Sequence, residues 1–152
     1  MKNSCKNPEN ISIGFLFSLF LKNQKIYFNK SLKQNNITIA HAPLLLMLLG
    51  YDDFIYQKDL VKKLYIDNAL ATRYLRKLEE EGLIERQEDN ENRRQNKIKL
   101  TTKGRKLAKN IYREKIRYEN QIIKDVIQKD EFIEILFKII KNSEEINEKQ
   151  EE

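Results

Sequence analysis

Apolar residues recur with a helical period along most of this chain, and short polar segments separate the periodic stretches. The run "ISIGFLFSLFL" at 11–21 lies in a first predicted helix over residues 10–34, which "NNIT" ends. Five further helices are predicted over 38–49, 57–65, 68–81, about 103–127 and about 130–142. Pro43 fits the first turn of the second, so its start could lie nearer Ala42, and Gly50 ends it. The pattern predicts a mostly helical protein.

Residues 83–100 change to a period of two. "LIERQ" and "KIKL" are predicted strands, joined by the polar turn "DNENRRQN", which carries Arg93 and Arg94 at its tip. Their apolar residues, predicted to hold the hairpin to the domain, are Leu83, Ile84, Ile98 and Leu100. "DDFIY" before the third helix supplies a turn and a very short extended piece. The order helix, short turn, helix, hairpin predicts a winged helix-turn-helix with the hairpin as its wing.

The fourth helix, capped by Asp67 and stopped by Gly82, has two faces of different character. Its apolar stripe, expected to pack on the domain, is Leu70, Ala71, Tyr74, Leu75 and Leu78. Its opposite stripe is polar and basic, and holds Asn68, Ala69, Thr72, Arg73, Arg76 and Lys77. No acid precedes Glu79 on this helix. Small, hydrogen-bonding and basic side chains suit a DNA major groove, and arginines on a wing suit phosphates or a narrow minor groove. A basic face that is merely solvated is the alternative.

Composition supports this interpretation. The 152 residues carry a net charge of +6, and residues 93–115 alone hold ten Lys or Arg and one acid. Such a chain forms one domain, or one domain with helical extensions, and a basic balance favours nucleic acid or an anionic surface. Thr101 or Thr102 is expected to cap the fifth helix.

The chain is poor in residues that carry chemistry. One cysteine, Cys5, and one histidine, His41, exclude an intramolecular disulfide, a multi-cysteine or histidine metal cluster and a Ser-His-Asp triad. His41 lies among apolar residues and is predicted to be a core or interface histidine. No catalytic residue, metal site or cofactor is therefore expected. The 11-residue apolar run is too short to cross a bilayer and no small-residue cleavage site follows it, so a cytoplasmic protein without a membrane partner is expected.

More apolar surface is predicted than one domain of this size should bury. It comprises the first helix and two rows on the last two helices, namely Leu107, Ile111, Tyr118 and Ile122, and Phe132, Leu136, Ile139 and Ile140. An almost wholly apolar helix near a chain terminus is often buried against another subunit. The sequence therefore predicts a homodimer.

Residues 57–104, with "LEEEGLIER", the double arginine of the turn and "LTTKG", resemble the core of the multiple-antibiotic-resistance regulator (MarR) family. The resemblance implies a homodimeric transcription regulator, usually a repressor, on a pseudo-palindromic DNA operator. It implies a helical dimerisation region at 10–37 and 103–148 and a DNA-binding domain at 38–102. It also implies a possible small anionic or aromatic effector.

Three positions depart from the family pattern. The family wing usually reads Asp-x-Arg-Asp-Arg-Arg, and Glu91 replaces its first arginine here. The peroxide-sensing branch has a cysteine where this chain has Gly14, which disfavours a thiol switch. Tyr56 stands where Ser or Thr usually caps the third helix. A winged-helix module that binds protein without reading DNA is the alternative function.

Overall fold

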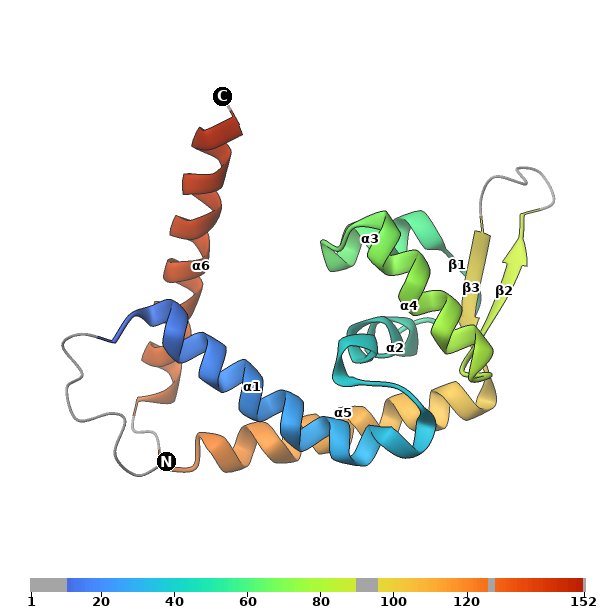
Figure 1. Ribbon diagram of the computed structural model, residues 1–152, viewed down its shortest axis with the longest axis horizontal. Helices are drawn as coiled ribbons and strands as arrows, with labels where there is room; N and C mark the ends of the chain where they lie inside the picture. The colour runs from blue at the N-terminus through green and yellow to red at the C-terminus, as the bar shows by residue number, and fades with distance from the viewer. Residues whose placement is uncertain (1–10, 90–95, 126–127, 152) are drawn as a thin grey trace. The chain divides into compact units, whose positions relative to one another are not determined.

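The computed structural model describes residues 11–89, 96–125 and 128–151. The helices and strands, in chain order, are α1 (Ile13–Leu32), η2 (Lys33–Asn35), η3 (Ile39–His41), α2 (Ala42–Leu49), β1 (Ile55–Tyr56), α3 (Gln57–Leu64), α4 (Asn68–Glu80), β2 (Ile84–Glu88), β3 (Asn96–Leu100), α5 (Thr102–Ile122) and α6 (Lys129–Glu151) (Figure 1). The predicted class, mostly helical with a small sheet, is confirmed. Two compact units, Met1–Tyr112 and Arg113–Glu152, divide the chain, and α5 continues from one into the other.

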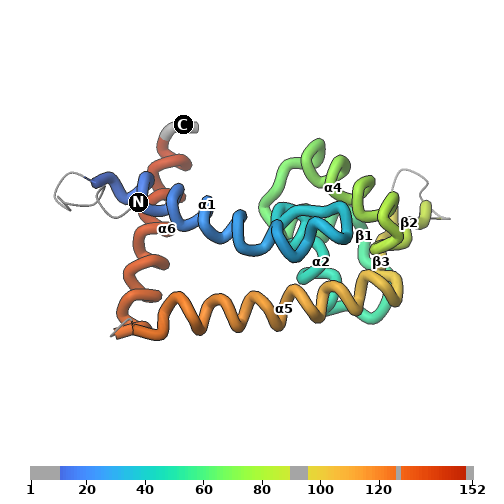
Figure 2. Tube along the Cα trace, turned by 60° about the horizontal axis from the view of Figure 1, so that its bottom comes forward, coloured from blue at the N-terminus to red at the C-terminus, as the bar shows by residue number. Residues whose placement is uncertain are grey.

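The first unit contains the winged helix. In both views α2 lies between α4 and the first turns of α5, and the hairpin of β2 and β3 stands beside the end of α4 (Figures 1 and 2). Its largest fully buried side chains are Leu44, Leu45, Leu48, Leu60, Leu75, Leu78, Leu83 and Ile98. These residues come from α2, α3, α4 and the hairpin, so the three helices and the sheet share one core. Pro43 lies in the first turn of α2, as predicted.

The sheet has three strands in the order β1-β3-β2, all antiparallel. Ile84 lies opposite Leu100, and Arg86 lies opposite Ile98. The predicted short extended piece is β1, where Ile55 pairs with Ile98. The sequence pattern did not predict this pairing, which makes β3 the central strand.

A close joint connects α4, the hairpin and α5. Gly82 ends α4 with φ +64, a backbone conformation that favours glycine. The Thr101 hydroxyl donates to the Gly82 carbonyl at 2.8 Å and accepts the Gly104 N–H at 2.9 Å, so Thr101 is the cap of α5. A Cβ on Gly104 would lie 1.8 Å from the Leu83 carbonyl oxygen, so only glycine fits there.

His41 is buried in the first unit, as predicted. Its Nδ1 accepts the N–H of Thr38 at 3.2 Å, and its ring lies 4.8 Å from the ring of Tyr74 on α4. Burial, which disfavours the charged imidazolium, lowers the pKa of His41. The histidine thus connects the turn before α2 with α4 as a neutral ring.

Among the described residues, three other than glycine have positive φ: Asn36, Tyr65 and Gln128. The left-handed region costs most side chains roughly 1–2 kcal/mol, and asparagine tolerates it best. Tyr65 ends α3 with φ 51 and ψ 37, and its side chain is 97% exposed. A bulky aromatic residue in this conformation is uncommon.

Helix boundaries differ from the prediction in the second unit. α5 ends at Ile122 rather than near residue 127, and α6 continues to Glu151, where the pattern predicted an end near 142. Glu and Lys are good helix formers, and Lys141 pairs with Glu145 one turn on at 3.7 Å, so the charged tail extends the helix. In the described part of the chain, none of the helices has the length and apolar character of a membrane span.

Candidate nucleic-acid interface

The local sequence of α4 determines how the helix presents its outer face. The Asp67 carboxylate accepts the Leu70 N–H at 2.7 Å, which caps the helix as predicted. Ala71, Leu75 and Leu78 are fully buried, whereas Leu70 and Tyr74 are half-buried. The apolar stripe therefore anchors α4 to the core and fixes which residues point outward.

The predicted DNA-contacting residues of α4 lie together on that outward face. Asn68, Ala69, Thr72, Arg73 and Arg76 are exposed, and Lys77 is half-buried. The Arg73 guanidinium lies 5.8 Å from the centre of the Tyr74 ring and has no acid partner among the described residues. Arg73 is thus a free cation near the middle of the helix.

The two other cations of this face are already paired. Arg76 Nε lies 3.1 Å from a Glu80 carboxylate oxygen, and Lys77 Nζ lies 2.7 Å from a Glu81 oxygen. The hydrogen bond between Lys77 and Glu81 raises the pKa of Lys77 and lowers the pKa of Glu81. Because these pairs offset charge at the C-terminal half, the positive charge of the face is concentrated at Arg73.

A bridge of polar side chains connects α3, α4 and β2. Arg86 donates from Nη2 to the Gln57 amide oxygen at 2.8 Å, and Gln57 donates from Nε2 to the Thr72 hydroxyl at 3.4 Å. A Glu79 oxygen lies 4.0 Å from Arg86 Nη1. The sequence pattern did not indicate Gln57 or Arg86 as functional residues. Strand alternation places Arg86 on the same face of β2 as the buried Ile84, which is the feature of the sequence that could have indicated its inward position.

The base of the wing is held by a buried carboxylate. Asp89 is 4% exposed, accepts the Tyr56 hydroxyl at 2.6 Å and lies 2.8 Å from Lys97 Nζ. The hydrogen bonds to Asp89 raise the pKa of both Tyr56 and Lys97. Tyr56, which gives α3 no side-chain cap, thus has a different role in fixing the hairpin to β1.

The predicted wing-tip residues Arg93 and Arg94, and Glu91 beside them, lie outside the described residues. Their assignment to phosphate or minor-groove contacts therefore stays a prediction. Across residues 11–89, 96–125 and 128–151, no three His, Cys, Asp or Glu side chains gather as a metal site requires.

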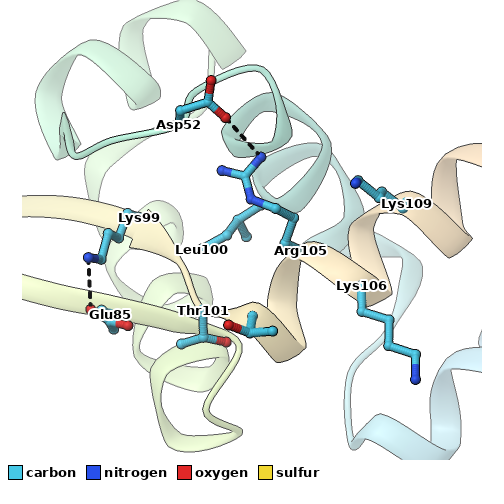
Figure 3. Close-up of a pocket in the computed structure, with 9 residues that line it drawn as sticks. Asp52, Glu85, Lys99, Leu100, Thr101, Arg105, Lys106 and Lys109 are labelled. Carbon is cyan, nitrogen blue, oxygen red and sulfur yellow. Dashed lines mark ion pairs between the residues drawn. The ribbon is translucent and has the colours of Figure 1, made fainter.

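A second basic region surrounds a cavity of about 500 Å³ at the start of α5. Figure 3 shows that its cations do not converge: Lys99 points toward Glu85, Arg105 toward Asp52, and Lys106 away from both. The Lys99–Glu85 and Arg105–Asp52 pairs measure 3.4 Å each, and Arg105 also donates to the Tyr51 carbonyl at 2.6 Å. The cavity therefore does not present a common anion site, and α4 remains the better candidate interface.

This unit is a winged helix, with three helices and a hairpin, and its third helix, α4, is capped and exposes a polar face. In this class of fold the second helix of the helix-turn-helix motif enters the DNA groove. Residues 42–95 match the family model described as "MarR family". Residues 42–95 therefore carry a MarR-family domain, and the relatives and solved structures to which the chain is similar are transcriptional regulators rather than enzymes.

Individual relatives agree with this assignment. The chain is 38% identical over 82 residues to the "Uncharacterized HTH-type transcriptional regulator YdgJ" of Bacillus subtilis (strain 168); the match covers 54% of this chain and half the length of that relative. The crystal structure of MarR has 25% identity and a TM-score of 0.75, and the match covers 94% of this chain and 98% of MarR. A Staphylococcus aureus MepR–DNA complex has the same fold, with 24% identity, a TM-score of 0.77 and coverage of 90% and 99%.

Proposed function

We propose that the chain is a homodimeric transcription repressor that binds double-stranded DNA by inserting the N-terminal half of α4 into the major groove. The observation that carries this proposal is the outward face of α4, where Thr72 and the free cation Arg73 are exposed and no acid lies before Glu79. Hydroxyl and guanidinium groups at this position suit base edges and phosphates. The MepR–DNA complex, which shares the fold, supports DNA as the partner.

The bridge from Arg86 through Gln57 to Thr72 supports a rigid presentation of this face. A side chain held by a neighbour loses less freedom on binding, which favours affinity. Arg93 and Arg94 on the wing are proposed to add contacts to phosphate or to a narrow minor groove.

The test is binding to the DNA upstream of the chain's own gene. We expect a gel shift with this DNA at a concentration that leaves a random duplex unbound, and a footprint with two half-sites centred roughly 10 bp apart, as a two-fold dimer requires. A reporter gene behind this DNA should be transcribed less when the protein is present. A single asymmetric half-site, or no binding to any duplex, would contradict the proposal and favour a winged-helix module that binds protein.

Two further parts of the proposal rest on the family. A DNA-binding regulator is expected in the cytoplasm, where the chromosome is. Repression is proposed to be relieved by a small anionic or aromatic ligand. Titration of the DNA complex with an aromatic carboxylate such as benzoate tests this: release of the DNA supports it, and an unchanged complex at saturating benzoate contradicts an effector of that chemistry.

A further inference from the structure

The turn between α3 and α4 exposes one aromatic side chain completely. The side chain of Tyr65 is 97% exposed and has no hydrogen bond, ion pair or ring contact with any described residue. The half-buried Tyr51 differs, because its hydroxyl bonds with Lys63 and its ring lies under the Lys63 ammonium group. Folding therefore gains nothing from the Tyr65 ring.

The backbone conformation at Tyr65 is also unfavourable for a tyrosine. Its φ is 51, and its N–H reaches the Lys62 carbonyl at a long 3.4 Å. At two other helix ends the chain fills the same left-handed conformation with Asn36 and Gly82, the residue types that tolerate it best. A strained residue whose side chain does nothing in the fold points to a function for that side chain.

The position of Tyr65 indicates what the side chain meets. It lies two residues before Asp67, the cap of α4, and three residues after Lys62, which is exposed and has no acid partner among the described residues. When the N-terminal half of a helix enters a major groove, the turn before it lies along the sugar-phosphate backbone that borders the groove. An exposed phenol and an ammonium group are both donors that phosphate oxygens accept.

We propose that Tyr65 binds the DNA backbone beside the groove that α4 enters, with its hydroxyl donating to a phosphate oxygen and its ring packed on the adjoining deoxyribose. Lys62 supplies positive charge to the same strand. The inference rests on the proposed DNA-binding function and adds to it a neutral contact that reads no sequence. It sets the position of α4 in the groove.

The test uses the full-length protein and a random 30-base-pair duplex, because a backbone contact does not depend on sequence. Tyr65→Asn removes the phenol and suits the left-handed backbone. We expect it to raise Tm by about 2–4 °C, yet to weaken DNA binding about tenfold, as loss of a hydrogen bond to a charged group does. Tyr65→Phe should lose affinity with no gain in Tm.

The salt dependence separates the two donors. A neutral tyrosine releases no counterion, so Tyr65→Asn and Tyr65→Phe should leave the slope of log affinity against log salt unchanged. Lys62→Gln should lower that slope by about 0.9 for each phosphate that the variant no longer neutralises. Gln128→Asn is the matched control, because it relieves the same backbone strain in the second unit and should leave DNA affinity unchanged.

Equal DNA affinity of the wild type and both Tyr65 variants would overturn the inference and leave the proposed function standing. Failure of the wild type to bind any duplex at low salt would overturn both. A lower Tm in Tyr65→Asn would also overturn the inference, since the ring would then stabilise the fold.

Discussion

His41, the single histidine of the chain, makes the pH dependence of stability attributable to one residue. A neutral ring whose Nδ1 accepts the Thr38 N–H carries its proton on Nε2. Protonation would place a second donor against that N–H and a charge inside the core. Protonation of His41 is therefore less favourable in the folded protein than in the unfolded chain.

The free energy of unfolding should fall as the pH drops below about 6.5, the ordinary pKa of histidine. Burial lowers the pKa of His41 in the folded state, so the unfolded state binds more protons in this window and the stability present above pH 6.5 is lost with acid. Urea titrations between pH 7.5 and 5.0 measure this. His41→Gln should be less stable at pH 7 but should lose the slope, and an unchanged slope would show that other groups cause it.

Arg73 and Arg76 are expected to contribute differently to DNA binding, because Arg76 is paired with Glu80 and Arg73 has no acid partner among the described residues. Arg73→Ala should weaken operator binding by about 1–3 kcal/mol, the worth of a good base contact, and random-duplex binding by less. Arg76 must first leave Glu80, so Glu80→Gln should strengthen binding to both DNAs at low salt. Fluorescence anisotropy with the two duplexes measures these changes. Arg117→Ala, outside the interface, is the control, and an equal loss on both duplexes in Arg73→Ala would refute base readout by Arg73.

The sequence alone identified the buried and exposed stripes of α4, the Asp67 cap and the buried His41, because these follow from helical periodicity. The Arg76–Glu80 and Lys77–Glu81 pairs can also be inferred from the sequence, because residues four apart meet on a helix. The contacts of Asp89 and Gln57 could not be predicted from the sequence. Those join residues 33 and 29 positions apart, and only the packed strands and helices bring them together.

At the scale of elements, the joint between the hairpin and α5 depends on the absence of one methyl group. Gly104→Ala would place a Cβ 1.8 Å from the Leu83 carbonyl oxygen, and backbone atoms cannot rotate away as a side chain can. We expect a loss of about 3 kcal/mol in unfolding free energy, at the upper end of overpacking effects. Chemical denaturation measures it.

Gly14→Ala is the matched control, since nothing lies within 4 Å of the added carbon. A helical glycine replaced by alanine should leave stability unchanged or raise it by up to about 1 kcal/mol. If Gly104→Ala were tolerated equally well, α5 would have to begin differently in solution.

Elements with many periodic residues were predicted well, and the shortest and most charged ones were not. β1 has two residues, too few for a pattern, and its pairing depends on the register with β3, 43 residues further along the chain. The charged end of α6 lacks an apolar stripe, so periodicity gave no reason to extend the helix to Glu151, and helix propensity alone indicated it.

For the whole molecule, the unburied apolar surface is the main indication of assembly. Exposed large apolar side chains of α1 and α6 include Phe15, Leu16, Leu21, Phe132, Ile135, Phe137 and Ile140. Soluble monomers rarely leave so many such residues in contact with water, which supports the proposed homodimer.

Phe137, 68% exposed in the single chain, tests this surface. Phe137→Glu should shift sedimentation from dimer toward monomer, because a carboxylate buried at an interface without a partner costs several kcal/mol. Asn142→Glu places the same group at a polar position of α6 and should remain dimeric. Wild-type protein that sediments as a folded monomer at micromolar concentration would refute the dimer.

The strand order also governs how the nascent chain can mature. β3 is the last strand to be synthesised, yet it lies in the centre of the sheet and pairs with both of the others. While the ribosome is still translating residues before 96, α2, α3 and α4 can form as local helices, but Ile55 and Ile84 have no strand to pair with. The apolar side chains that finally surround Ile98 are therefore open to chaperones and proteases until that segment emerges. Pairing of β3 with both other strands then completes the winged helix.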